Sequence, residues 1–354
     1  MKVKNEKEEL SRREFIKRSS ISALGVSLLG TMPASLKGAL LKDPVAKKSK
    51  VVLVKHSKVA APGGEIDLKI LSDMLDKGIT GFSGEKSASS YWSKIFSPKE
   101  SIGLKVNTLG LSNVSGSPVT NHFQAVTSSI IGSFNGTGIE EGNFIIWDRS
   151  EEELISAGFA IQNEKGKTRV LGNVGTRRGG GGIGYSEEEL KAGDKTTHLS
   201  KILTEMCSSI IAIPLMKDHG VAGVTGALKN HYGSIDNARE FHANNGTNPG
   251  IPDINLLPGI RSKQKLIIMD ALMGVFNGGP RWDRRFIWPY GGILIGTDPV
   301  AIDTVMFGII NEKRKSEGLD LISESNARHI RISGEMGLGS NNMEEIDLVK
   351  IELG

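Results

Sequence analysis

The sequence predicts an α/β protein with a largely parallel or mixed sheet, helices on both faces and an irregular glycine-rich insertion. Short runs rich in β-branched residues alternate with helical patterns over most of the chain. This alternation is typical of strands that are joined by helices and lie parallel in one sheet. The length of 354 residues is enough for one large core. The predicted strands cover residues 51–55, 102–106, 144–147, 210–214, 266–269 and 293–295.

Helical periodicity follows several of these strands. Ser150 and Glu153 have the spacing of a capping box at the start of one helix. Another helix is expected to begin at Asp298, because Pro299 suits the first helical position and an apolar stripe follows. The other predicted helices, with the one after Ser150, cover residues 66–77, 119–134 and 151–157.

The pattern indicates one α/β domain over residues 51–354, preceded by a polar linker at 40–50. No shift in composition divides this domain further. Residues 161–197 lack a clear periodicity and include four consecutive glycines. We expect this stretch to be an insertion or a lid that closes over a ligand.

Residues 1–39 have the features of a twin-arginine signal segment. Arg12 and Arg13 precede one variable residue, an aromatic and an aliphatic, and the mildly apolar run 21–32 follows. This order predicts export by the twin-arginine machinery, to the periplasm or the outer face of the cytoplasmic membrane. The alternative is a basic amphipathic helix that lies on another domain.

The apolar run is shorter than the roughly 20 residues of a membrane-spanning helix, so no permanent span is expected. A small-x-small cleavage triplet is not evident near Ala34 or Ala39, because Met32 and Lys37 occupy the −3 positions. Cleavage and an uncleaved membrane anchor both stay open.

Charge and cysteine content exclude several classes of protein. The formal charge is +4, and the first 39 residues alone hold eight basic side chains against four acidic ones. The rest of the chain is neutral, which argues against nucleic acid as the main partner. Cys207 is the single cysteine, so this chain alone can form neither a disulfide nor an iron–sulfur cluster. Packing in the core is its expected role.

The densest group of polar residues follows the predicted strand 210–214. Histidine is a common general acid or base and a common metal ligand, while lysine binds carboxylates and phosphates. We therefore expect His219, His231 and Lys229 to act in catalysis, and Lys217 and Asn230 to bind substrate. With His242, the two histidines form a candidate site for a divalent metal, although their spacing matches no fixed zinc motif. The alternative is that these side chains only hydrogen-bond loop backbone.

Two further candidates for substrate binding lie elsewhere. Lys105 and Asn107 are two residues apart at the end of a strand and therefore share one face. An edge-strand lysine that extends to water is the alternative. Arg177 and Arg178 precede the four glycines, and backbone amides in such loops can hold phosphate, although a solvated loop would show the same pattern.

Asp270 follows the strand 266–269 and is a candidate catalytic carboxylate. Capping a helix or pairing with a lysine is the alternative for this residue. Asp298 is expected to cap its helix, whereas Asp303 interrupts an apolar stretch and could face a cleft.

The sequence resembles the domain of unknown function 362 family over roughly residues 51–310. The resemblance lies in GLKVN at 103–107, IPLMKDH at 213–219, GVTGALKNHYG at 223–233 and the strand that ends at Asp270. Some relatives carry a ferredoxin-like iron–sulfur module, from which this chain departs. The resemblance supports the position of the site and implies no reaction.

Three functions fit these observations. The first is an exported enzyme whose lysines, histidines, asparagines and aspartate act on a small anionic or metal-bound substrate. The second is a non-catalytic accessory protein that binds a ligand or an iron–sulfur redox partner. The third is a metal carrier that uses the three histidines.

Overall fold

The computed structural model describes residues 48–177, 179–242 and 247–354. The predicted signal residues Arg12 and Arg13 and the loop residue Arg178 lie outside these ranges. The body from residue 48 onward forms one compact unit. Within the described ranges, no helix is both long enough and apolar enough to span a membrane.

A ten-stranded mixed sheet organises the protein and confirms the predicted α/β class. Its main path runs β12-β1-β11-β10-β7-β2-β3-β4, and β8 and β9 extend it beside β10. Neighbouring strands from β10 through β7, β2 and β3 to β4 are parallel, whereas β11 is antiparallel to both β1 and β10. The strands of the sheet are β1 (Ser49–Lys55), β2 (Ile102–Lys105), β3 (Phe144–Ser150), β4 (Arg169–Val174), β7 (Ser209–Ala212), β8 (Leu215–His219), β9 (Gly223–Val224), β10 (Gln264–Val275), β11 (Ile287–Gly296) and β12 (Ile346–Glu352).

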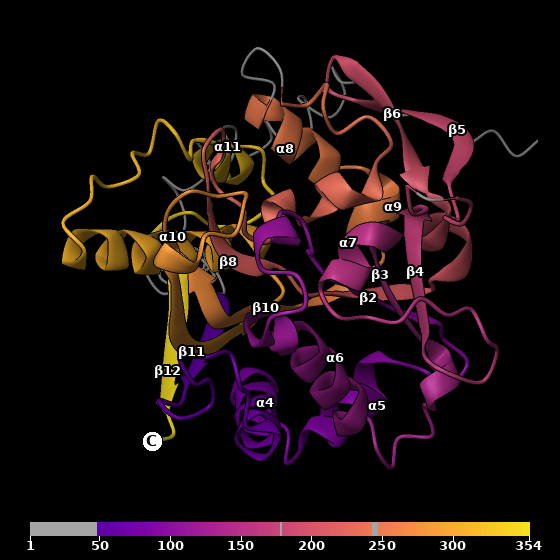
Figure 1. Ribbon diagram of the computed structural model, residues 1–354, viewed down its shortest axis with the longest axis horizontal. Helices are drawn as coiled ribbons and strands as arrows, with labels where there is room; N and C mark the ends of the chain where they lie inside the picture. The colour runs from indigo at the N-terminus through magenta and orange to yellow at the C-terminus, as the bar shows by residue number, and fades with distance from the viewer. Residues whose placement is uncertain (1–47, 178, 243–246) are drawn as a thin grey trace, which may run out of the picture. The chain divides into compact units, whose positions relative to one another are not determined.

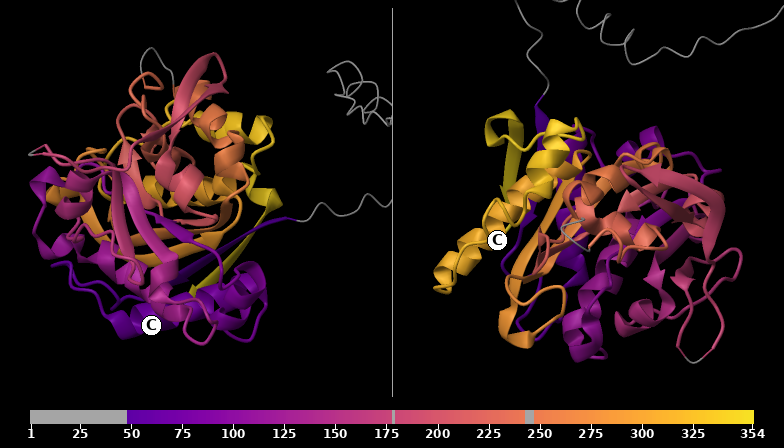
Figure 2. Two further views of the ribbon diagram at one scale, coloured as in Figure 1. Left: turned by 90° about the vertical axis from the view of Figure 1, so that its right-hand side faces the viewer. Right: turned by 90° about the horizontal axis from the view of Figure 1, so that it is seen from above.

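Helices cover both faces of the sheet (Figure 1). The helices α4, α5 and α6 lie on one face, and α8, α9, α10 and α11 lie on the other. The hairpin of β5 and β6 is separate from the large sheet and lies on the α8 side (Figure 1, Figure 2). These elements are α4 (Leu68–Ser83), α5 (Ala88–Ile95), α6 (Asn121–Ser133), α7 (Glu151–Ser156), α8 (Thr247–Asn255), α9 (Pro258–Arg261), α10 (Pro299–Ser316), α11 (His329–Glu335), β5 (Tyr185–Ala192) and β6 (Lys195–Ser200).

The alternation of side chains along the central strands divides the core into two layers. In β1, Val52 and Val54 belong to the layer on the α4 and α6 side, while Val51 and Leu53 belong to the layer on the α10 side. All four are buried. A strand covered on both faces needs apolar residues at every position, which explains the unbroken β-branched runs in the sequence. Full burial of each such side chain stabilises the fold by about 1.5–3 kcal/mol.

Several local expectations need correction. Ser150 is the N-cap of α7, but its side chain makes no capping hydrogen bond, because Glu153 pairs with Arg149 instead of closing a capping box. β10 does not end at Asp270 but continues to Val275, since β8 and β11 pair with it there.

Two expected loops are also more regular than the sequence indicated. Residues 217–219 belong to β8 and do not form a loop after a strand. The stretch 161–197 contains β4, which extends the sheet, and most of the β5–β6 hairpin. Most of the expected linker 40–50 lies outside the described residues, and its last two residues belong to β1. Whether residues 161–197 move as a lid stays a prediction.

The predicted start of α10 is confirmed. Asp298 is the N-cap, and its Oδ1 accepts hydrogen bonds from the backbone N–H groups of Val300 and Ala301 at 2.8 and 2.9 Å. Its Oδ2 accepts from the backbone N–H of Ser340 at 2.8 Å. One carboxylate therefore joins the start of α10 to the chain that leads into β12.

We expect Asp298→Ala to lower the free energy of unfolding by about 1–2 kcal/mol, because an unfilled N-cap leaves helix N–H groups without a partner. Urea denaturation monitored by circular dichroism measures this loss. Asp73→Ala, on the exposed face of α4, is the matched control and should change stability by less than about 0.5 kcal/mol. Equal losses for both variants would contradict the capping role.

Candidate functional site

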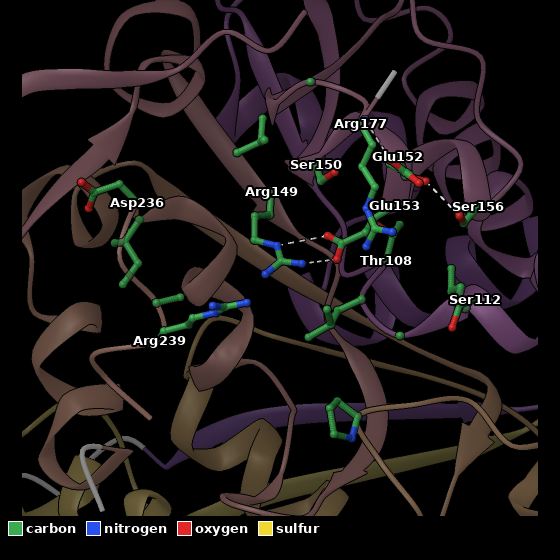
Figure 3. A pocket seen from close by; sticks show the side chains of 18 of the residues that line it. Thr108, Ser112, Arg149, Ser150, Glu152, Glu153, Ser156, Arg177, Asp236 and Arg239 are labelled. Atoms are coloured by element: carbon green, nitrogen blue, oxygen red, sulfur yellow. Dashed lines mark hydrogen bonds and ion pairs between the residues drawn. The ribbon is translucent and has the colours of Figure 1, made fainter. Parts of the chain in front are cut away.

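An open cleft of about 870 Å³ lies where the chain leaves β2, β3 and β4. These strands are parallel and adjacent, so their carboxyl ends meet at one edge of the sheet, where α/β proteins place ligands. The volume falls in the usual range for small-molecule sites. Its polar lining includes Thr108, Ser112, Arg149, Ser150, Glu152, Glu153, Ser156, Arg177, Tyr185, Asp236, Asn237, Arg239, Glu240 and Arg281 (Figure 3).

A smaller recess of about 60 Å³ adjoins the cleft. Leu109, Arg149, Glu153 and Ala238 line both cavities, so the recess and the cleft lie side by side. It has room for one functional group of a ligand. The remaining residues of its lining are Asn107, Asp148, His219, Thr225, Lys229, Asn230, Tyr232, Gly233 and His242.

A buried ion pair forms the base of this region. Lys105, the last residue of β2, places its Nζ 2.7 Å from Oδ1 of Asp148 on β3 and 2.7 Å from the carbonyl oxygen of Val106. Oδ2 of Asp148 accepts from the backbone N–H and the hydroxyl of Thr108 at 2.6 and 2.7 Å. Burial raises the pKa of Asp148, but the charge and hydrogen bonds of Lys105 and Thr108 outweigh burial and lower it. Asp148 is therefore an ionised, fully occupied carboxylate.

The segment that carries Lys229 packs directly on this ion pair. A Cβ at Gly233 would lie 2.6 Å from Oδ1 of Asp148 and 2.8 Å from Nζ of Lys105, so only glycine allows this approach. The side-chain amide of Asn230 donates to the carbonyl oxygen of Lys105 at 3.1 Å. These contacts fix the 3₁₀ segment Leu228–Ser234 against the ends of β2 and β3.

Asp303 on α10 holds the start of the same segment. Its two carboxyl oxygens accept from the backbone N–H groups of Ala227 and Leu228 at 2.6 and 3.0 Å. Asp303 therefore positions the segment and does not face the cleft, since it lines neither cavity.

Lys229 is the most unusual group in the recess. Its side chain is almost fully buried, with 4% of the residue exposed, and no carboxylate of the described chain lies within 4.0 Å of its Nζ. Nζ lies 2.8 Å from Nε2 of His242 and 4.0 Å from the centre of the Tyr232 ring. Burial, with Lys217 and Arg149 nearby, lowers the pKa of Lys229 to about 7. A neutral amine is therefore accessible near physiological pH.

The hydrogen bonds of two histidines beside Lys229 fix which ring nitrogen carries the proton. Nδ1 of His242 donates to the carbonyl oxygen of Ala238 at 2.8 Å, so Nε2 is free to accept from Lys229. Nδ1 of His219 accepts from the backbone N–H groups of Val221 and Ala222, so its proton lies on Nε2. The two rings stack with centres 5.7 Å apart. Burial, with Lys229 close by, lowers the pKa of His242 to about 4 and that of His219 to about 2. Both are neutral at pH 7.

At the mouth, Arg149 and Glu153 form an ion pair across one turn of chain (Figure 3). Burial lowers the pKa of Arg149, but the hydrogen bonds and charge of Glu153 outweigh this and raise it. Arg177 and Arg239 extend toward this pair from opposite sides (Figure 3). Neither they nor Arg281 contact a carboxylate within 4.0 Å in the described part of the chain.

The structure brings together only some of the predicted site residues. Asn107, His219, Lys229, Asn230 and His242 line the recess, and Arg177 lines the cleft. Lys105, Lys217, His231 and Asp270 line neither cavity.

Lys105 and Lys217 are bound by the protein itself. Nζ of Lys217 lies 2.9 Å from the carbonyl oxygen of Leu109 and 3.3 Å from that of Pro280. Burial lowers the pKa of Lys217 to about 8. It therefore ties two cleft-forming loops together from beneath.

His231 and Asp270 have partners away from the recess. His231 is fully buried, and its ring nitrogens lie 3.0 Å from the hydroxyl of Ser234 and 2.8 Å from Oε1 of Gln264. Oδ2 of Asp270 lies 2.5 Å from Nδ1 of His122, which is also fully buried. Asp270 thus neither caps a helix nor pairs with a lysine.

The three candidate metal ligands do not converge, since His231 lies apart from the stacked pair of His219 and His242. In the ranges that the structure describes, no group of three or more His, Cys, Asp or Glu side chains is arranged to hold a metal ion. Cys207 is buried, and burial raises the pKa of its thiol to about 12, in keeping with a packing role.

Several important residues of the site are absent from the sequence-based predictions. Asp148 and Arg149 follow the apolar run 144–147, and the rule that polar residues gather at the carboxyl ends of parallel strands could have found them. Arg239 and Arg281 carry no such signal, because exposed loop arginines are common.

Comparisons with known proteins find a family model that matches part of the chain, and they indicate no activity. Residues 183–308 match the family model described as Domain of unknown function (DUF362), which supports the resemblance over the part of the chain that includes Lys229. A crystal structure of a Thermotoga maritima protein from the Northeast Structural Genomics Consortium is similar, with a TM-score of 0.37 and 13% identity. That match covers 77% of this chain, which spans only 60% of the other protein's length. No curated protein matches.

We expect Lys105→Met to lower the free energy of unfolding by about 3–5 kcal/mol, because it leaves Asp148 as an uncompensated buried charge. The double variant Lys105→Met/Asp148→Asn removes that charge and should recover part of the loss. Guanidinium denaturation of both variants gives the difference. If the double variant is as unstable as the single one, the uncompensated charge of Asp148 is not the cause of the lost stability.

Proposed function

We propose that this protein is an exported enzyme that acts on a small anionic substrate. In this proposal the substrate lies in the cleft and extends one functional group into the recess beside Lys229. Export by the twin-arginine route is part of the proposal and depends on the SRREFIK pattern at residues 11–17.

The observation that carries the proposal is the position of Lys229. A lysine amine is costly to bury without a carboxylate, and structural lysines of this chain have other partners, as Lys105 and Lys217 show. Perturbed titratable groups of this kind gather at functional sites. Because Lys229 lines a cavity, a ligand can reach it.

The charges around the cleft support an anion more than a cation. Four arginines and four acidic residues line it, but the acids already have donors within the protein. Glu153 binds Arg149, and Asp236 accepts from Thr197 and His198. Glu152 accepts from the backbone N–H of Arg177, and Glu240 accepts from the side-chain amide of Asn237. In the part of the chain that the structure describes, the guanidinium groups of Arg177, Arg239 and Arg281 have no carboxylate within 4.0 Å. Guanidinium groups bind carboxylates and phosphates in two-pronged geometry.

Neutral histidines in the recess favour catalysis over simple binding. His219 presents an N–H donor, and Nε2 of His242 accepts a hydrogen bond from Lys229. General acid–base chemistry requires a proton donor and a proton acceptor close to the same reacting group. A non-catalytic binding protein would use the same arginines without needing these two rings.

We expect Arg239→Ala/Arg281→Ala to weaken the binding of small anions about tenfold or more, since each lost charged hydrogen bond costs about 1.5–3 kcal/mol. Isothermal titration with pyruvate, lactate and inorganic phosphate measures the effect. Arg261→Ala, an exposed arginine of α9 outside the cleft, is the matched control and should bind like the unaltered protein. Failure of all three anions to bind, or equal affinities for both variants, would contradict an anion site here.

A further inference from the structure

Three lysines are buried near the site, and their partners differ in kind. Lys105 binds a carboxylate, and Lys217 binds two carbonyl oxygens. Lys229 alone of the three lines a cavity, and its hydrogen-bond partner is a neutral imidazole. The first two are held as cations, whereas the surroundings of Lys229 suit an uncharged amine.

His242 provides the proton acceptor that such an amine needs. Its Nδ1 proton is occupied by the carbonyl oxygen of Ala238, so the lone pair of Nε2 points at Nζ of Lys229 from 2.8 Å. When an uncharged Lys229 donates a hydrogen bond to His242, the lone pair of its Nζ is directed away from His242. The Tyr232 ring covers another side of Nζ.

The other residues that line the recess offer hydrogen bonds to the polar atoms of a ligand. His219 contributes an Nε2–H donor. Oδ1 of Asn107 and Oδ1 of Asn230 are buried acceptors without a partner in the described chain, and these residues are 8% and 1% exposed. A buried acceptor is costly unless a ligand or water donates to it. Hydroxyl or N–H groups of a ligand in the recess are donors of the kind that these oxygens lack.

We propose that Lys229 forms an imine with the aldehyde or ketone group of a small anionic substrate. The Nζ lone pair attacks the carbonyl carbon, a C–N bond forms, and the carbonyl electron pair moves to oxygen. His242 takes the proton that the attacking nitrogen loses, and the oxygen gains a proton to give a carbinolamine. Loss of the hydroxyl group with a second proton, as water, leaves the C=N bond. No electrons are exchanged with any other reagent.

This inference rests on the proposed function and names its substrate class. The arginines of the cleft would hold the carboxylate or phosphate, and the carbonyl would enter the recess, which has room for one such group. A lysine imine serves as an electron sink for bond cleavage beside the carbonyl carbon. Small oxo acids and sugar-phosphate-like aldehydes have this chemistry.

The test is reductive trapping on the full-length protein. Glyoxylate and pyruvate are added separately with sodium cyanoborohydride, and the protein is digested and mapped by mass spectrometry. The expected result is one predominant adduct, on Lys229, with either probe. The other lysines of the same digest are internal controls for non-specific labelling. Absence of a Lys229 adduct, or labelling spread over exposed lysines, would overturn the proposal.

A second variant and a second ligand separate the two proposals. Lys229→Arg cannot form an imine, so it should lose the adduct. Lactate has no aldehyde or ketone group and is expected to bind through the arginines of the cleft, so its binding should remain. Circular dichroism checks that this variant is folded. Lactate binding without any Lys229 adduct would reject the imine and leave the anion site intact. Loss of both in the unaltered protein would reject both proposals.

Discussion

The buried ion pair between Lys105 and Asp148 is the constraint on which the site depends. Removing two charges from water costs several kcal/mol for each ion, and this cost is offset only when every donor and acceptor is occupied. Asp148 meets that condition through Lys105 and both donors of Thr108. The pair therefore fixes the spacing of the ends of β2 and β3 and the first turn of the loop that borders the cleft.

The Lys229 segment is held between this pair and α10. At one end Asp303 binds the backbone before Lys229, and at the other Gly233 contacts Asp148. Asn230 adds a hydrogen bond to the strand end itself. Contacts on both sides of the segment stabilise the buried position of the Lys229 amine. The amine alone would not stabilise this position, because it has no carboxylate partner. Rigid support of this kind is what a reactive side chain requires.

The sequence predicted the fold class and most central strands, because strands buried on both faces have a strong apolar signal. It also predicted a polar cluster around Lys229, and in the structure His219, Asn230 and His242 line the same recess as Lys229. It could not predict that Lys105 binds Asp148, which is 43 residues away, nor that Asp270 binds His122, which is 148 residues away. Such pairings depend on which strands become neighbours, and no local pattern encodes that order. For this reason two predicted site residues, Lys105 and Asp270, lie outside the cavities.

The central claim is that burial lowers the pKa of Lys229 far enough to make an uncharged amine available near neutral pH, in a recess beside the cleft. NMR of the isotope-labelled lysine Cε resonances, assigned by comparison with Lys229→Arg, measures its titration directly. The account predicts that burial and the nearby cations place the pKa of Lys229 near 7. Titration at the ordinary lysine value, near 10.4, would contradict it and would leave Lys229 as a simple charged contact.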